Sequence, residues 1–137
     1  MHSSSPEAVC LYSELDNGIH QIVLTESSRQ AVDGWIAAVE HIYENAQPND
    51  LVRMLADLRC GAQPFAYTML RMRDLLKKYP QRPRARTAFY HDPDFLAFIV
   101  RDLVTATIKT SIGSGRDAVD FFPSDQYDKA IQWLLLD

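Results

Sequence analysis

The sequence predicts a single α/β domain built on a five-stranded, mostly parallel sheet. Two short strand-like runs separated by a turn open the chain, over 9–15 and 19–25, and helix-like and strand-like segments then alternate in the order ββαβαβαβα. Such alternation is typical of parallel strands joined by right-handed crossovers. The first two runs are close enough in the sequence to form an antiparallel hairpin. A chain of 137 residues is long enough for one domain with its own core.

The first predicted helix follows the hairpin, over 27–46. Ser27 and Gln30 have the spacing of a capping box, in which two side chains satisfy the first backbone N–H groups of a helix. Apolar side chains then recur at helical spacing and are expected to pack on the sheet: Val32, Trp35, Ile36, Val39, Ile42 and Tyr43. We expect a flexible tail over 1–8, so that the domain spans 9–137.

The next strand and helix are predicted over 51–58 and 64–79. The strand alternates, so that Val52, Met54, Ala56 and Leu58 are expected to share one face. Pro64 suits the first helical position, and Pro80 ends the helix. The buried stripe of this helix is predicted to be Phe65, Met69, Met72, Leu76 and Tyr79.

The carboxyl-terminal part repeats the pattern. We predict a strand over 84–91, a helix over 92–109, a short strand over 118–122 and a last helix from Ser124. Asp92 suits the N-cap of the third helix. Because that helix is apolar almost all round, we expect it to pack on more than one side.

Polar residues interrupt the predicted strands, which strands covered on both faces seldom show. We therefore expect helices mainly on one face of the sheet and a more open second face. Apolar residues on that second face are Tyr12, Leu51, Leu55, Tyr90 and Phe122. Such a face predicts a homodimer, provided that it buries the area of a standard interface.

Positive charge is concentrated in residues 71–86, which hold seven of the 14 Lys and Arg residues of a chain whose net charge is −4. The helical half of this stretch is explained by a solvated helix face. Arg84 and Arg86 are different, because strand alternation places both on one face. They reach solvent, pair with acids or bind an anion, and pairing is the favoured alternative, with acids of the segment 1–52 in the same subunit or across a dimer.

Composition excludes several classes of function. A pI near 5.5 argues against general nucleic-acid binding, for which basic surfaces are typical. The sequence contains no apolar run long enough to span a membrane, no signal peptide and only two cysteines, so we expect a cytoplasmic protein without disulfides. The histidines lack the spacing of metal ligands, and we expect no metal or other cofactor.

His91 and Asp92 lie where a predicted strand ends, which is where parallel sheets place ligands. A histidine beside a carboxylate can act as a general base or bind a metal. The simpler interpretation is that Asp92 caps the following helix and that His91 only ends the strand.

Two other loops carry residues of types that are used in catalysis or ligand binding. Arg59 and Cys60 follow the strand over 51–58, and a neighbouring arginine favours a reactive thiolate. A small buried cysteine is the commoner alternative. The stretch "GSGR", ending at Arg116, has backbone N–H groups that can hold a phosphate, although a plain flexible connector is the favoured interpretation.

Three stretches together resemble a known family: "LVRMLADLRCG", "RARTAFYHDPDFLAFI" and "AVDFFPSDQYDKAIQWL". They are similar to the third strand, the fourth strand with its helix, and the last strand with its helix in SpoIIAA-like domains of the STAS/SEC14 type. The resemblance covers about 9–137 and implies a β/α sheet domain that is usually not an enzyme. Relatives include anti-anti-sigma factors with a regulatory serine after the third strand. Here "GAQPFAYT" occupies that region and offers Thr68, so the resemblance does not extend to that switch.

Three hypotheses of function follow. The first is a non-enzymatic binding or regulatory module, with a protein partner and a surface that includes Arg59, Arg84, Arg86, His91 and Arg116. The second is a carrier of a small apolar or lipid-like anionic ligand beneath the third helix, lined by Phe95, Phe98, Ile99, Leu103 and Ile108. The third is an enzyme that uses His91 and Asp92.

Overall fold

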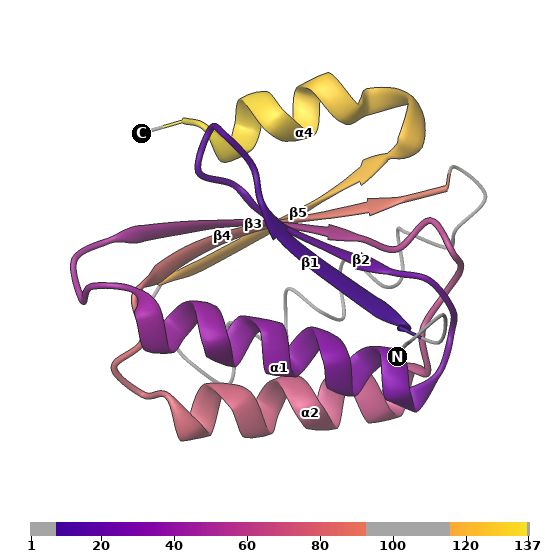
Figure 1. The fold of residues 1–137 in the computed structure, drawn as a ribbon, viewed down its shortest axis with the longest axis horizontal. Coiled ribbons are helices and arrows are strands. Elements are labelled where there is room, and N and C mark those ends of the chain that lie inside the picture. Colours follow the sequence, from indigo (N-terminus) through magenta and orange to yellow (C-terminus); the bar gives the residue numbers. More distant parts are fainter. Residues whose placement is uncertain (1–7, 93–115, 137) are drawn as a thin grey trace, which may run out of the picture.

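The computed structural model describes residues 8–92 and 116–136, and their strands form one five-stranded sheet (Figure 1). The strands lie in chain order, β1-β2-β3-β4-β5, with β1 antiparallel to β2 and the other pairs parallel. This is the predicted fold class. The strands are β1 (Cys10–Glu14), β2 (His20–Leu24), β3 (Leu51–Asp57), β4 (Arg84–His91) and β5 (Asp117–Pro123). The helices are α1 (Arg29–Asn45), α2 (Phe65–Lys78), the 3₁₀ turn η1 (Ser124–Gln126) and α4 (Tyr127–Leu134).

The hairpin turn forms as its sequence predicts. Gly18 has a φ of +85°, a left-handed conformation that is costly for residues with a Cβ. The side chain of Asn17 accepts a hydrogen bond from the backbone N–H of Ile19, and Leu15 N–H donates to the carbonyl of Ile19. The predicted tail over 1–8 and the predicted helix over 92–109 lie almost wholly outside the described residues.

Helix α1 begins two residues later than predicted. Ser28 is the N-cap, and its hydroxyl accepts a hydrogen bond from the backbone N–H of Ala31. The predicted capping box of Ser27 with Gln30 is therefore wrong. The hydroxyl of Ser27 instead donates to the carbonyl of Ala62, so this residue ties two loops together.

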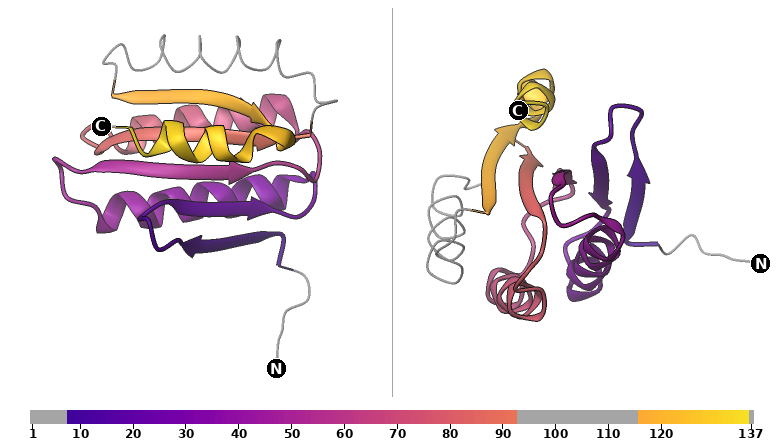
Figure 2. Two further views of the ribbon diagram at one scale, coloured as in Figure 1. Left: turned by 90° about the horizontal axis from the view of Figure 1, so that it is seen from above. Right: turned by 90° about the vertical axis from the view of Figure 1, so that its left-hand side faces the viewer.

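Helices α1 and α2 cover one face of the sheet, whereas α4 lies on the other (Figures 1 and 2). The larger core lies beneath α1 and α2, where the stripe predicted for α1 meets alternate residues of the strands. It includes Ile22, Leu24, Val32, Trp35, Ile36, Val39, Val52, Met54, Ala56, Phe89 and Phe121. In α2 the buried residues are Met69, Met72 and Leu75. The predicted burial of Phe65 is wrong, since its exposed fraction is 41%.

The second face of the sheet is less open than the sequence suggested. Helix α4 packs there and forms a smaller core, so that much of the surface predicted for a homodimer is buried. Leu55, Tyr90 and Phe122 all belong to this core, and only Tyr12 and Leu51 retain appreciable exposure. This face is covered because the chain leaves the edge strand β5 through η1 and returns across the face that α1 and α2 do not cover (Figure 2). None of the helices in the described ranges has the length and apolar content that crossing a membrane requires.

Candidate functional site at the carboxyl edge of the sheet

The parallel strands end side by side, and their carboxyl ends bring together Asp57 at the end of β3 and His91 at the end of β4. The β3–α2 loop, residues 58–64, runs along this edge. Arg59 in that loop lies over the ring of Tyr90, with its guanidinium carbon 4.8 Å from the ring centroid. The sequence therefore placed Arg59 and His91 correctly at one edge.

Asp57 fixes the orientation of Arg59. The Arg59 Nε and Nη2 atoms donate to the two Asp57 carboxylate oxygens at 2.8 to 3.2 Å, and Asp57 Oδ1 also accepts the Arg59 backbone N–H at 3.1 Å. Hydrogen bonding to Asp57 raises the pKa of Arg59. Asp57 is buried, but the Arg59 side chain is 52% exposed. The result is a guanidinium held in one orientation on a side chain that is half exposed.

Tyr90 supports the Arg59 guanidinium and is itself held in place. Its hydroxyl donates to the backbone carbonyl of Ser124 at 2.9 Å, so that the ring is tied to the β5–α4 connection. The stacked guanidinium gains a cation–π contact with the ring. Arg59 is thus supported from β3, from β4 and, through Tyr90, from the start of η1.

The β3–α2 loop is fastened to the loop before α1. The side chain of Gln63 accepts a hydrogen bond from the Ser28 backbone N–H at 3.1 Å and donates to the Glu26 carbonyl at 2.8 Å. Gly61 has a φ of +127°, which turns the chain between Arg59 and Gln63. These contacts limit the motion of the loop that presents Arg59.

Cys60 is exposed beside Arg59, so the prediction of a buried cysteine is wrong. Partial burial of the sulfur raises the pKa of the Cys60 thiol, and the Asp57 carboxylate adds to that shift. Hydrogen bonds, including one from Gln63 Nε2 to Sγ at 3.5 Å, oppose it without reversing it. The thiol is therefore kept protonated, which is unfavourable for a nucleophile.

His91 points inward from the edge. Its exposed fraction is 3%, its ring lies against Phe121 at 6.2 Å, and its Nδ1 is 2.8 Å from the backbone oxygen of Asp92. Asp92 itself is exposed. The helix that Asp92 was predicted to cap lies outside the described residues.

Arg86 lies far from this edge and contacts the end of α4. Its Nη1 donates to the carbonyls of Trp133 at 3.2 Å, Leu134 at 3.5 Å and Leu136. The expectation that acids from segment 1–52 of the same subunit oppose Arg86 is wrong. Carbonyl groups at the last turn of a helix carry partial negative charge and take that role within the subunit.

The other predicted arginines lie at the opposite, amino edge of β4 and β5. Arg84 is exposed, and no hydrogen bond or ion pair of its side chain is found among residues 8–92 and 116–136. Arg116 donates from Nη1 to the carbonyl of Arg82 at 2.8 Å, and its own carbonyl accepts the Ala85 N–H. Arg59, Arg84, Arg86, His91 and Arg116 therefore do not form one site.

Arg82 forms a buried ion pair that the sequence did not suggest. Its side chain is 3% exposed, and Nη2 lies 2.6 Å from Asp117 Oδ2. Its Nη1 donates to the carbonyls of Leu76 and Tyr79, which closes the end of α2. The loop after α2 is thereby fixed to the start of β5.

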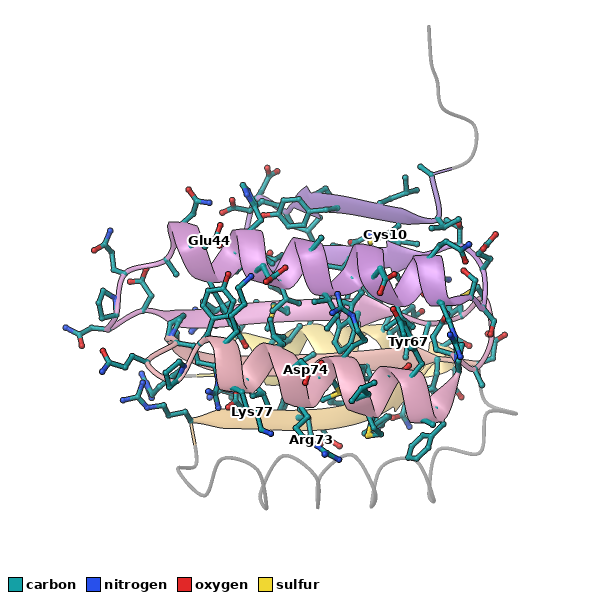
Figure 3. The ribbon with its side chains drawn as sticks, turned by 90° about the horizontal axis from the view of Figure 1, so that it is seen from below. Cys10, Glu44, Tyr67, Arg73, Asp74 and Lys77 are labelled. Atoms are coloured by element: carbon teal, nitrogen blue, oxygen red, sulfur yellow. The ribbon has the colours of Figure 1, made fainter. Side chains whose placement is uncertain are left out.

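Three acids of α1 pair with α2 and its C-cap residue Tyr79, not with the strand arginines. Tyr67 donates to Asp33 at 2.5 Å, Lys78 to Glu40 at 2.6 Å, and Tyr79 to Glu44 at 2.6 Å. Hydrogen bonding to Glu44 raises the pKa of Tyr79 to about 12. Arg73 and Lys77 lie on the side of α2 away from α1 (Figure 3).

A cleft lined by residues of the hairpin and of the end of α1 was not predicted from the sequence. Its volume is about 610 Å³. The Tyr12 hydroxyl lies 2.8 Å from His20 Nδ1, and the Tyr12 ring also contacts His41, with ring centroids 5.8 Å apart. Burial lowers the pKa of His20, Glu14 opposes this shift, and His41 adds to it. The signal was available, because the turn signal at 16–18 sets a hairpin register in which Glu14 is paired with His20.

Metal-binding side chains are not clustered in the described ranges. No group of three or more His, Cys, Asp or Glu side chains there has the arrangement of a metal site. The lining predicted for a lipid-like ligand, Phe95, Phe98, Ile99, Leu103 and Ile108, lies outside these ranges.

Comparison with known proteins gives no further assignment. No family model, no curated protein and no solved structure matches the chain. The arrangement of residues at the carboxyl edge is therefore the basis for assigning a function.

Proposed function

We propose that this protein is a non-enzymatic binding or regulatory module, and that it binds a protein partner through the carboxyl edge around Arg59. The observation that carries the proposal is the state of Arg59: fixed by Asp57, stacked on Tyr90 and half exposed. Arginine and tyrosine are both enriched among the residues that dominate protein interfaces. Little conformational entropy remains to be lost when a partner carboxylate binds it.

The neighbouring groups favour binding over catalysis. The thiol of Cys60 is kept protonated, the carboxylate of Asp57 is engaged by Arg59, and His91 is buried. A general base must reach the proton that it removes, and a buried His91 does not. The resemblance to SpoIIAA-like domains supports the same proposal, although a shared fold alone does not determine function.

The experiment is an affinity capture with three proteins: wild type, Arg59→Ala and Arg73→Ala. Arg73 is a matched control, because it is an exposed arginine on α2 (Figure 3). The partner that wild type and Arg73→Ala retain is purified, and its binding is measured by calorimetry. We expect Arg59→Ala to weaken binding by roughly 30-fold, the effect of an interface hot spot.

Two results would refute the proposal. One is a partner whose affinity is unchanged by Arg59→Ala. The other is catalytic turnover by the purified protein that His91→Ala abolishes. Subunit number is measured alongside by sedimentation, because α4 covers most of the surface on which the sequence placed a homodimer.

A further inference from the structure

Strand β1 forms one edge of the sheet, and no strand among residues 8–92 and 116–136 lies on its outer side (Figure 2). All of its residues except Cys10 are exposed, and Leu11 has an exposed fraction of 50%. An open edge strand can pair with another chain, and proteins often prevent this with lysine, proline or a β-bulge. β1 contains neither residue type, and its register with β2 is unbroken. Three common features that prevent pairing are therefore missing from it.

The backbone groups on the outer side of β1 belong to alternate residues. In an antiparallel pair, every second residue bonds to the partner strand, and the residues between direct their N–H and C=O groups away from it. The Val9 carbonyl accepts the Thr25 N–H. The Leu15 N–H donates to the Ile19 carbonyl, so the odd-numbered residues face β2. No hydrogen bond to the outward backbone groups is found in the described part of the chain, and these groups belong to Cys10, Tyr12 and Glu14.

A second copy of the chain can pair with all of these groups at once. If a twofold axis passes through Tyr12, the two β1 strands are antiparallel, with Tyr12 opposite the partner's Tyr12 and Cys10 opposite the partner's Glu14. Three outward residues are then paired, and two hydrogen bonds for each give six. An axis through Leu11 or Ser13 pairs only two outward residues of β1 and gives four. The backbone therefore favours the axis at Tyr12.

The side chains fit the same register. Tyr12 contacts His41 of α1, so Leu11 and Ser13 lie on the opposite side of the sheet. There Leu11 lies opposite the partner's Ser13 and diagonal to the partner's Leu11. Diagonal neighbours on paired strands are within reach of long side chains. The dimer would thus cover an apolar side chain that is half exposed in one copy.

The position of Glu14, the only charged residue in β1, also fits this register. Glu14 lies opposite the partner's Cys10 and at least about 13 Å from the partner's Glu14, because four residues along the strand separate them. At physiological ionic strength exposed charges are largely screened beyond about 8 Å. The net charge of −4 on each copy therefore adds only a general repulsion, which salt reduces.

We propose that two copies of this chain pair through β1 and form one continuous sheet, with Tyr12 on the twofold axis. The contact is symmetric and uses the same edge of both copies, so association through it stops at two. Two strands of five residues are small beside a standard interface, which buries about 1,200 Å² or more, so we expect a weak dimer. This proposal is independent of the function proposed for the carboxyl edge.

Sedimentation equilibrium of the full chain tests the proposal at roughly 10 µM to 1 mM protein, where weak interfaces associate. Wild type should change from monomer to dimer across this range. Leu11→Lys removes the apolar contact and brings like charges together, so it should weaken the dimer roughly tenfold. Leu70→Lys is the matched control and should have no effect, because Leu70 is also 50% exposed but lies on α2.

Two additions keep this comparison decisive. If circular dichroism shows that Leu11→Lys does not fold, Ser13→Lys replaces it, because Ser13 is exposed on the same side of β1. Arg59→Ala should leave the dimer unchanged, since Arg59 lies in the β3–α2 loop. Dimerisation and partner binding at the carboxyl edge can then fail separately.

Disulfide trapping tests the register. Leu11→Cys and Ser13→Cys are made separately in chains that also carry Cys10→Ser and Cys60→Ser, and the two are mixed in a thiol–disulfide buffer. With the axis at Tyr12, positions 11 and 13 of opposite copies form a pair whose Cα atoms are about 4.5 Å apart, which suits a disulfide. We expect the 11–13 cross-link to be the main product.

Three results would overturn the proposal. The first is a monomer at every concentration, even if the wild type captures a different protein through β1. The second is a dimer that Leu11→Lys and Leu70→Lys affect equally, which would place the contact elsewhere. The third is a main product that joins position 11 to 11 or 13 to 13, which would exclude the axis at Tyr12.

Discussion

Arg53 and Arg86 occupy paired positions on β3 and β4, and both donate a hydrogen bond to the same carbonyl oxygen, that of Leu134 at the end of α4. The shorter of the two, from Arg53 Nε, is 2.6 Å long. The Arg86 guanidinium also lies over the ring of Trp133, 5.6 Å from its centroid. Two strand arginines thus hold the last helix of the chain on the sheet.

Arg86→Met should destabilise the attachment of α4. Hydrogen bonds that involve a charged group contribute about 1.5–3 kcal/mol, so we expect the free energy of unfolding to fall by about 2 kcal/mol. Urea titration followed by tryptophan fluorescence measures this, since Trp133 reports on α4 directly. Arg84→Met is the matched control, because Arg84 is exposed on the same strand, and it should change stability by less than about 0.5 kcal/mol. Equal effects of the two variants would contradict the role given to Arg86.

The buried pair of Arg82 with Asp117 should be far more sensitive than the exposed pairs of α2. Asp117→Asn leaves a buried guanidinium without its counter-charge, and loss of one partner of such a pair lowers the free energy of unfolding by about 3–5 kcal/mol. The double variant Arg82→Met/Asp117→Asn should recover part of the loss, because it removes the unpaired buried charge. Thermal unfolding of the wild type, Arg82→Met, Asp117→Asn and the double variant measures the coupling.

Lys78→Met serves as the control for that cycle. Lys78 and Glu40 are also an ion pair, at 2.6 Å, but Lys78 is exposed. We expect its substitution to leave the unfolding midpoint unchanged, because exposed pairs are weak. Strictly additive effects at positions 82 and 117 would show that burial does not couple them.

The pH dependence of stability should carry a contribution from His20. Burial lowers the pKa of His20 below its ordinary value of about 6.5, so the unfolded chain binds a proton more readily than the folded one. The contribution of His20 to the free energy of unfolding is therefore fully present above about pH 6.5, and it is lost as the pH falls toward the pKa of His20 in the folded chain. Glu14 and His41 face the same ring and act in opposite directions.

Unfolding free energies between pH 7.5 and 5.5 test this expectation. His20→Gln should flatten the decline, and an NMR titration of the His20 ring should give a pKa below that of an unfolded peptide. A raised pKa of His20, or a slope unchanged by His20→Gln, would contradict the sign derived from burial.

Gly34→Ala should destabilise the protein although alanine is the better helix former. A Cβ at position 34 would lie 2.7 Å from Cys10 Cβ, so β1 and α1 would have to move apart. Overpacking of this kind lowers the free energy of unfolding by about 1–3 kcal/mol, more than the gain in helix propensity. Cys10→Gly in the same chain should restore most of the loss, and urea titrations of both variants measure it. Stabilisation by Gly34→Ala alone would show that the two elements separate easily.

Periodicity predicted the strands well because each strand buries a regular subset of its residues. Alternation placed Val52, Met54 and Ala56 on the face beneath α1 and α2, and Leu55 on the other, as observed. The same pattern could not predict that the second face is covered. The side on which α4 packs depends on the path of the chain after an edge strand, which local spacing does not contain.

The candidate site was predictable only in part. The carboxyl ends of neighbouring parallel strands meet, which correctly brought Arg59 and His91 to one edge. Burial of Arg82 was not foreseeable, because its partner Asp117 is 35 residues further along the chain. The cleft around Tyr12 and His20 was foreseeable from the hairpin register alone, whereas its contact with His41 depends on how α1 packs.

The agreement between strand order and chain order has a consequence for synthesis on the ribosome. Within residues 8–92 and 116–136, each strand pairs only with strands that are adjacent in the chain, so each strand after β1 emerges when its first partner is already made. Folding can then proceed from the amino terminus as translation does. The exception is α4. Arg53 and Arg86, which hold it on the sheet, are synthesised before the α4 carbonyl groups to which they donate. We expect a nascent chain that ends before residue 124 to form the sheet, while the face that α4 later covers stays exposed to solvent and to chaperones until α4 leaves the exit tunnel.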